Sequence, residues 1–320
     1  MSDVFWQAFS AMFSAIAKVF VIAFAAGLLV RKKIIKQEYI KGLSEVTVKV
    51  LLPALIFSNI VKTFAPATTP GWWALPLVGL FTPVIFLGIT ALFFLKNFKQ
   101  NLSKLPVAAF QNAGYLVLPI GQVLYPEQFD QFALFVFLYI LGFNPSLWSV
   151  GKVLITRTKE NAKFEVKDII TPPLIANIIA LTLVFSTLNN NIPEIIFDPI
   201  EFIGSATVPM ATFILGATLG TVSFKKLPPI GEILKILFVK YVIIPVLVLL
   251  IILQFKIGEK SSLLADFLII EASAAPASNL IIMVRKYGGD AQQTGGLMLL
   301  AYFAAIFIMP LWIAIWKMMG

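Results

Sequence analysis

The sequence predicts an all-α polytopic membrane protein with ten transmembrane helices, arranged as a 5+5 inverted repeat in which helices 4 and 9 are broken and cross. Three observations predict this fold class. Of the 320 residues, 59% are apolar and only 13% are charged, whereas a soluble domain is about half apolar and about a quarter charged. The apolar residues form runs long enough to cross a bilayer. Prolines interrupt these runs at corresponding places in the two halves.

Ten apolar runs define the expected helices, since a transmembrane helix needs about 20 residues. Each run ends at charged residues or at Pro and Gly. All six tryptophans fall near the expected ends, where an amphipathic ring prefers the headgroup layer. In chain order, we expect the helices at residues 5–30, 43–61, 72–95, 105–125, 129–151, 168–188, 197–220, 232–254, 263–285 and 296–316.

The positive charges predict the orientation of these helices. Cytoplasmic loops of membrane proteins carry an excess of Lys and Arg, and in this chain alternate connections are basic while the others are not. We therefore expect an integral protein of the plasma membrane (the cell inner membrane) with both termini outside. The net charge of +9 lies between apolar runs and does not indicate a nucleic-acid partner. The basic connections are 31–41, 96–104, 152–167, 225–226 and 285–286, and the others hold Lys62, Lys256, Lys260 and Lys317.

The proline spacing predicts an internal repeat. Pro53 and Pro119 are 66 residues apart, and Pro209 and Pro276 are 67 residues apart. With five segments in each half, the second half must run through the membrane upside down relative to the first. We expect the first repeat at residues 1–160 and the second at 161–320. Two such halves can rock about a central site and expose it to each side in turn, which is how a carrier works.

The fourth and ninth segments carry polar residues and a proline near their middles. The fourth contains Asn112, Gly114 and Pro119, and the ninth contains Pro276 followed by Ser278 and Asn279. A mid-helix proline removes a backbone hydrogen bond, and the freed polar groups survive in a membrane only where they line a cavity. Two half-helix N-termini would then face the membrane centre, where their partial positive charge favours an anion, above all a carboxylate. For the two asparagines, cross-helix bonding is the alternative.

Cysteine and histidine are both absent, which excludes disulfides, Cys/His zinc sites, iron–sulfur clusters and His-dependent nucleophilic triads. The sequence has no G-x-x-x-x-G-K-[ST] phosphate loop and therefore does not indicate an ATP-driven pump. We expect no enzyme activity, no cofactor and no metal centre.

Five stretches resemble the auxin efflux carrier family, which includes plant PIN-FORMED auxin exporters and bacterial malate or malonate permeases. They are AGLLVRKKIIKQEYIKGLSEVTVKVLLPALIFSNI (26–60), NAGYLVLPIG (112–121), TPPLIANIIAL (171–181), ATVPMATFILGATL (206–219) and APASNLIIMVRKYGGD (275–290).

The resemblance implies a fold like that of bile acid symporters and NhaA, with helices 4 and 9 crossing at their prolines. It also implies a scaffold of helices 1, 2, 6 and 7, a moving elevator domain of helices 3–5 and 8–10, and commonly a homodimer. Asn112, Pro119 and Pro276 match the family's crossover positions, and Asn279 falls in its polar stretch after the proline. The long cytoplasmic loop of many plant members is absent.

Two charged residues lie deep in apolar segments: Lys18 in the first and Glu271 in the ninth. A charge at the bilayer centre costs about 2.5–3.5 kcal/mol on insertion scales, so each should face protein or water and be paired or neutral. Glu271 is expected to couple transport to protons, because burial favours its neutral form, or else to make a structural hydrogen bond as a protonated carboxyl. Lys18 is expected to pair with a carboxylate or a helix C-terminus rather than to contact substrate.

The sequence therefore favours a secondary carrier for a small organic anion, such as a carboxylate or an auxin-like acid, held where helices 4 and 9 cross. Membrane potential, protons or both would drive it. The alternative is a sodium-coupled symporter resembling the bile acid sodium symporters, which needs several oxygen ligands at the crossover. Glu271 is the one deep acid that the sequence offers there.

Overall fold

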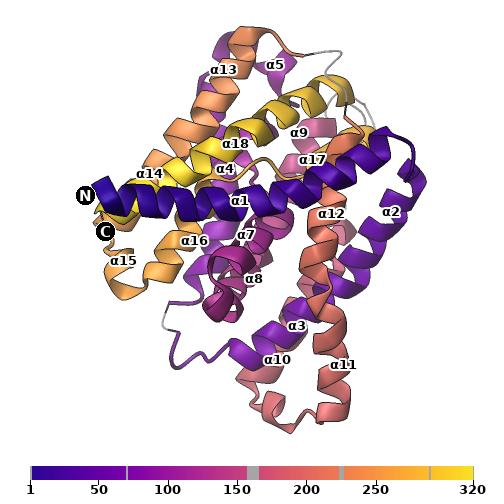
Figure 1. The fold of residues 1–320 in the computed structure, drawn as a ribbon, viewed down its shortest axis with the longest axis vertical. Coiled ribbons are helices and arrows are strands. Elements are labelled where there is room, and N and C mark those ends of the chain that lie inside the picture. Colours follow the sequence, from indigo (N-terminus) through magenta and orange to yellow (C-terminus); the bar gives the residue numbers. More distant parts are fainter. Residues whose placement is uncertain (1, 70, 157–165, 223–226, 288–289, 320) are drawn as a thin grey trace.

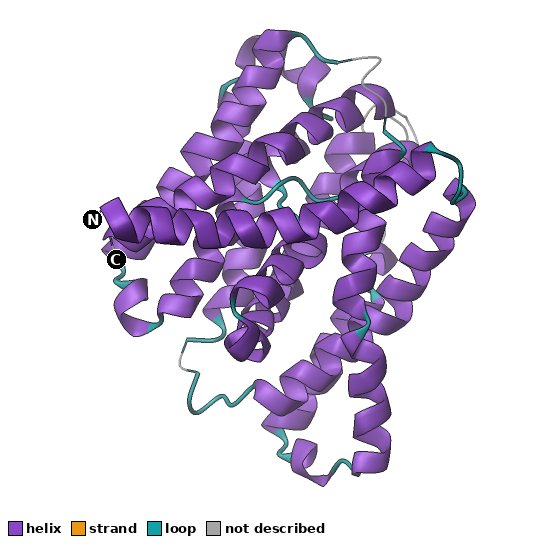
Figure 2. Ribbon diagram, viewed as in Figure 1, coloured by secondary structure: helices purple, strands orange, loops and turns teal. Residues whose placement is uncertain are grey.

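The computed structural model describes residues 2–69, 71–156, 166–222, 227–287 and 290–319, and within these ranges the regular elements are helices (Figure 2). Seven helical spans are long and apolar enough to cross a membrane, which supports a polytopic integral membrane protein. These spans are Asp3–Arg31, Gln37–Thr63, Ala74–Leu92, Pro126–Ile155, Glu194–Gly220, Ile230–Gln254 and Ala291–Met319.

The α-helices follow one another along the chain as labelled in Figure 1. They are α1 (Ser2–Arg31), α2 (Gln37–Val46), α3 (Leu52–Thr63), α4 (Ala74–Leu92), α5 (Phe98–Asn101), α6 (Leu105–Ala109), α7 (Leu118–Leu124), α8 (Phe129–Ser146), α9 (Lys152–Thr156), α10 (Pro172–Phe185), α11 (Glu194–Ser205), α12 (Thr207–Gly220), α13 (Ile230–Phe238), α14 (Ile244–Gln254), α15 (Ile257–Lys260), α16 (Ser262–Ser273), α17 (Asn279–Tyr287) and α18 (Ala291–Met319).

Three of the ten expected segments are missing from the seven long spans. The segments 105–125 and 263–285 are each interrupted, and the segment 168–188 forms α10, which has 14 residues. The count of ten membrane crossings and the inverted repeat stay predictions. The expected boundary between the repeats, at residues 160 and 161, and the basic residues Arg157, Lys159, Lys163, Lys225 and Lys226 lie outside the described residues.

Several expected boundaries are wrong by more than a turn; the tenth helix, for example, begins at Ala291 rather than near residue 296. The second helix begins at Gln37 rather than near residue 43, because the polar α2 continues the apolar span in one helical rod. Apolar runs mark only the part of a helix that contacts hydrocarbon, whereas polar turns that extend beyond it leave no such signal.

Three prolines are each preceded by a π-helical turn. The turns Thr47–Leu51, Ala113–Val117 and Val239–Ile243 each end two residues before a proline, at Pro53, Pro119 and Pro245 respectively. A π turn shifts the backbone hydrogen-bonding pattern by one residue. We attribute to this shift the ability of the helix to include a proline, which has no backbone N–H to donate. These helices therefore pass their prolines without unwinding.

Glycines let four of the long helices approach closely. A methyl group at Gly216 of α12 would collide with the backbone of Ala23 in α1, and one at Gly79 of α4 would collide with the backbone of Tyr139 in α8. Small residues at such contacts allow helices to pack tightly in membranes. α8 is the innermost of the long helices, with every side chain from Phe132 to Ile140 buried.

The bundle has two ends, which we name by their connections. The basic face carries the connections 31–36 and 93–104, and the opposite face carries the connection 64–73 and α15. The continuous helix from Gln37 to Thr63 runs from the first face to the second. The N- and C-termini lie close together near α15 in Figure 1. Large apolar side chains such as Phe24, Ile195 and Phe202 are exposed on the outside of the bundle, where lipid would cover them.

Candidate functional site

The first interruption lies between α6 and the helix that begins at Ala113. Residues Phe110 to Asn112 are unwound, and Asn112 has φ −99° and ψ 67°. Its Oδ1 accepts the N–H of Tyr115 at 3.2 Å. This is an N-cap interaction, which satisfies one of the donors that the start of a helix leaves unpaired. Asn112 therefore starts the second half of this segment by capping it.

The second interruption separates α16 from α17. The backbone is unwound from Ala274 to Ser278, with Pro276 in the middle. Pro276 cannot continue a helix, and the residues on either side of it are small alanines. α17 begins at Asn279 and carries Arg285 in its second turn. This half of the ninth segment also presents its N-terminus at the break.

The two unwound stretches pair with each other. Gln111 and Pro276 form an antiparallel bridge. The N–H of Asn112 donates to the carbonyl of Ala275 at 2.9 Å, and the N–H of Ala277 donates to the carbonyl of Phe110 at 2.9 Å. Unwound backbone buried at membrane depth must find hydrogen bonds within the protein, and here each break supplies them to the other.

One side chain ties both breaks together from a third helix. The hydroxyl of Tyr302, on α18, accepts the Nδ2–H of Asn112 at 2.7 Å and donates to the carbonyl of Pro276 at 2.7 Å. Tyr302 is almost fully buried. Its hydroxyl uses both its donor and an acceptor site, so the crossing is held by side-chain as well as backbone bonds.

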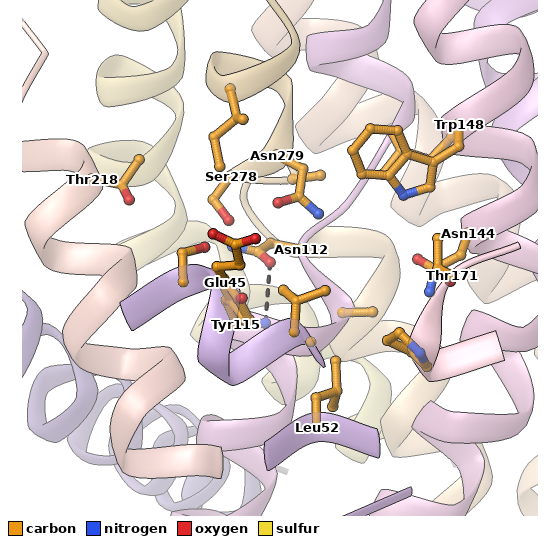
Figure 3. A pocket seen from close by; sticks show the side chains of 18 of the residues that line it. Glu45, Leu52, Asn112, Tyr115, Asn144, Trp148, Thr171, Thr218, Ser278 and Asn279 are labelled. Carbon is orange, nitrogen blue, oxygen red and sulfur yellow. Dashed lines mark hydrogen bonds between the residues drawn. The ribbon is translucent and has the colours of Figure 1, made fainter. Parts of the chain in front are cut away.

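A cavity of about 1020 Å³ lies beside the crossing (Figure 3). The predicted site residues Asn112, Gly114, Ser278 and Asn279 all line it. Further lining residues come from the long helix that starts at Gln37, from α8, from the start of α10 and from the ends of α12 and α17; they include Glu45, Lys49, Asn144, Trp148, Thr171, Thr218 and Arg285. These elements meet at the basic face, so the cavity opens toward that face.

The cavity offers donors for an anion. Two helices begin at its wall, at Ala113 and at Asn279, and the first N–H groups of a helix carry partial positive charge. The side chain of Asn279 makes no hydrogen bond within the described part of the chain. Arg285 donates to the Oγ1 of Thr221 at 2.9 Å and keeps further N–H groups. The cavity is also lined by two acids, Glu38 and Glu45, but these carboxylates are paired with Lys36 and Lys49 respectively.

The two predicted site prolines, unlike the two asparagines, do not line the cavity. Pro276 lies within the second break but does not line the cavity. The expectation that Pro119 stands at the crossing is wrong, because Pro119 lies in the first turn of α7 and Gln111 takes the crossing position opposite Pro276. The π turn before Pro119 keeps that helix intact, and the proline spacing therefore did not locate the break.

The two charged residues predicted to lie deep in the membrane differ in burial: Lys18 is exposed and Glu271 is buried. Lys18 is exposed on α1, lines neither of the two cavities described here, and has no hydrogen-bond or ion-pair partner among the described residues. The expected pairing of Lys18 is not found. Glu271 is 3% exposed and lies on the last turns of α16, close to the second break. It lines a smaller cavity of about 210 Å³ rather than the large one.

Sequence reasoning missed three residues near the crossing: Gln111, Lys240 and Tyr302. Gln111 precedes Asn112 and is buried. Lys240 lies well inside the apolar span Ile230–Gln254, a depth that could have singled it out. Tyr302 carries no signal, since a tyrosine in an apolar helix is ordinary. In the described ranges, no three His, Cys, Asp or Glu side chains come together in a possible metal site.

An apolar helical bundle with two interrupted segments that pair beside a cavity with polar side chains in its wall is typical of membrane transporters. The comparisons agree: a family model described as "Membrane transport protein" matches residues 11–313, and the chain belongs to this family. The match confirms the resemblance to auxin efflux carriers. An uncharacterized transporter of Methanocaldococcus jannaschii is 30% identical over 199 residues, which are 60% of this chain and 64% of that protein, a little under two thirds of its length.

Proposed function

We propose that this protein is a secondary carrier that moves a small organic anion, such as a carboxylate or an auxin-like acid, across the plasma membrane by alternating access. The observation that carries this proposal is the pairing of two unwound stretches, Phe110–Asn112 and Ala274–Ser278, beside a large cavity. Membership of a membrane transport family supports it.

The chemistry of the cavity favours an anionic substrate. The helix starting at Ala113 and α17, which starts at Asn279, direct their N-termini to it, and such termini attract carboxylates. Asn112, Ser278 and Asn279 would add side-chain donors, and Arg285 would add a positive charge farther along α17. A volume of about 1020 Å³ is at the upper end of the usual range for ligand pockets.

The packing of the long helices supports an inverted repeat. α1 packs on α12, and α3 packs on α10. α1 and α12 lie in expected helices 1 and 7, and α3 and α10 lie in expected helices 2 and 6. An inverted repeat would match helix 1 to helix 6 and helix 2 to helix 7, so the two contacts would be equivalent. In this proposal helices 1, 2, 6 and 7 form the scaffold, helices 3–5 and 8–10 move, and the basic face is cytoplasmic with both termini outside.

Uptake into proteoliposomes tests the proposal. Radiolabelled mono- and dicarboxylates are offered with imposed pH, sodium or voltage gradients, and empty liposomes serve as the control. We expect at least one carboxylate to accumulate, and to raise the Tm of the purified protein, because a ligand of the folded state stabilises it. If no gradient moves any carboxylate, the carrier proposal is wrong. Uptake driven by sodium alone would favour the symporter alternative.

A further inference from the structure

The crossing separates two cavities that lie toward opposite faces of the bundle. The large cavity is lined by Gln37, at the start of the second helical span, and by Thr221, beyond the end of α12. The small cavity is lined by Thr69 and by Ile257, in the connections of the opposite face. Gln111 lines both cavities, and no other residue is common to the two linings. One side chain at the crossing therefore forms a wall between the two spaces.

Two polar side chains in the small cavity lack partners. Both carboxylate oxygens of Glu271 and both polar atoms of the Gln111 amide are buried without a hydrogen bond in the described part of the chain. Glu271 is 3% exposed and Gln111 is 1% exposed. Buried polar groups are normally bonded, and an unpaired buried carboxylate is among the most costly. Such groups call for a ligand that the protein itself does not supply.

A buried lysine adds a positive charge that acts on Glu271. Lys240 is 0% exposed, and its Nζ makes a long 3.4 Å contact with the carbonyl of Ala108, near the C-terminal end of α6. Lys240 and Glu271 interact electrostatically, yet no hydrogen bond joins them. The charged carboxylate is therefore stabilised in part by Lys240, but its lone pairs remain free to accept a proton.

The remaining lining is mostly apolar, with three hydroxyls, those of Thr69, Thr82 and Tyr139. Tyr139 of α8 is a second titratable group that interacts with Glu271, and its hydroxyl lies 3.4 Å from the Oγ1 of Thr82 in α4. Residues such as Phe86, Phe135 and Leu268 complete the wall. A volume of about 210 Å³ has room for several waters at roughly 30 Å³ each, which would carry a proton from the opposite face to Glu271.

We propose that Glu271 and Gln111 form a proton-binding site on the other side of the crossing from the anion cavity, reached from the opposite face of the bundle. The role of this site in transport rests on the proposed carrier function, whereas proton binding itself does not. A proton fits better than sodium, because sodium needs several oxygen ligands, whereas a proton needs only the carboxylate. Gln111 lines both cavities, so a change in the protonation of Glu271 would alter the hydrogen bonds that Gln111 offers to the anion.

Access is tested by cysteine labelling, for which the chain is suited because it has no cysteine. Leu268→Cys places a thiol in the small cavity, and Thr218→Cys places one in the large cavity. A charged, membrane-impermeant thiol reagent should modify Leu268→Cys from the opposite face and Thr218→Cys from the basic face. Labelling of Leu268→Cys from the basic face alone would overturn the proposed route.

Proton binding is tested on Glu271→Gln, with Glu232→Gln as the matched control, since Glu232 is a partly buried acid that pairs with Lys104 and lines neither cavity. The Tm of the wild type and of the control should fall as the pH rises, because ionisation of a buried carboxyl disfavours the folded state. Glu271→Gln should lack this fall. In transport, the wild-type rate should change with pH by up to about tenfold per unit, the limit for one proton, and Glu271→Gln should lose that dependence while keeping counterflow.

The outcomes separate the two proposals. If no anion is transported but Glu271→Gln still abolishes the pH dependence of the Tm, the proton site stands and the carrier function falls. If an anion is transported and Glu271→Gln keeps the wild-type pH profile in both measurements, the proton site is refuted. A Tm that responds to sodium at constant pH, and loses that response in Glu271→Gln, would replace the proton by sodium.

Discussion

The two breaks at the crossing are built differently, although they pair with each other. The break at Ala274–Ser278 contains a proline and small residues, whereas the break at Phe110–Asn112 contains no proline and relies on Asn112 as a cap. Both are held by the same backbone bonds and by the same tyrosine. A proline is therefore not required for an interruption here, since the break at Phe110–Asn112 has none, whereas both breaks supply hydrogen-bond partners to each other's backbone.

The largest effect is expected at the shared tyrosine. Tyr302→Phe removes two hydrogen bonds and leaves the Nδ2–H of Asn112 without its acceptor and the Pro276 carbonyl without its donor. We expect a loss of about 2–4 kcal/mol in the free energy of unfolding, measured by denaturation of the purified protein, together with weaker anion binding. Tyr125→Phe is the control, because it removes a bond to Asp266 at the opposite face and should leave binding unchanged. Equal binding in the two variants would show that Tyr302 does not organise the site.

The two asparagines should separate binding from stability. Asn112→Ala and Asn279→Ala should each weaken anion binding by more than about tenfold, on the order of 1.4 kcal/mol, in a binding assay on purified protein. Only Asn112→Ala should also lower the Tm, since Asn112 bonds to Tyr302 and to the N–H of Tyr115. Wild-type affinity in Asn279→Ala would remove that residue from the proposed site.

The smallest effect is expected at the proline of the second break. The paired backbone bonds run through Ala275 and Ala277 and need no N–H from residue 276, so Pro276→Ala should change the free energy of unfolding by less than about 1 kcal/mol. Anion affinity should change by less than about threefold. Pro119→Ala is the matched variant, because it lies in α7 outside both cavities. A collapse of binding in Pro276→Ala alone would restore proline as the cause of the break.

A good part of the candidate site was predictable from the sequence. Asn112, Gly114, Ser278 and Asn279 were found because polar residues in the middle of an apolar run have few places to go other than a cavity. Pro119 was misplaced because spacing between prolines carries no information on whether a π turn absorbs them. Gln111 was overlooked because it stands next to a stronger signal, Asn112. Lys240 was overlooked because it is eight residues from the expected start of its segment at residue 232 and was interpreted as lying near the helix end.

The sequence alone determined that the chain is an apolar helical membrane protein with polar interruptions in its fourth and ninth segments. The reason is that a bilayer strongly favours apolar side chains toward lipid and requires backbone groups to be hydrogen-bonded within the protein. The tertiary structure alone decided which residues meet at the interruptions. The partner of Pro276 is Gln111, the side chain that joins both breaks comes from α18, and the lysine facing Glu271 comes from the span of α13 and α14. Contacts between distant segments depend on how the helices pack, and packing leaves no local pattern in the chain.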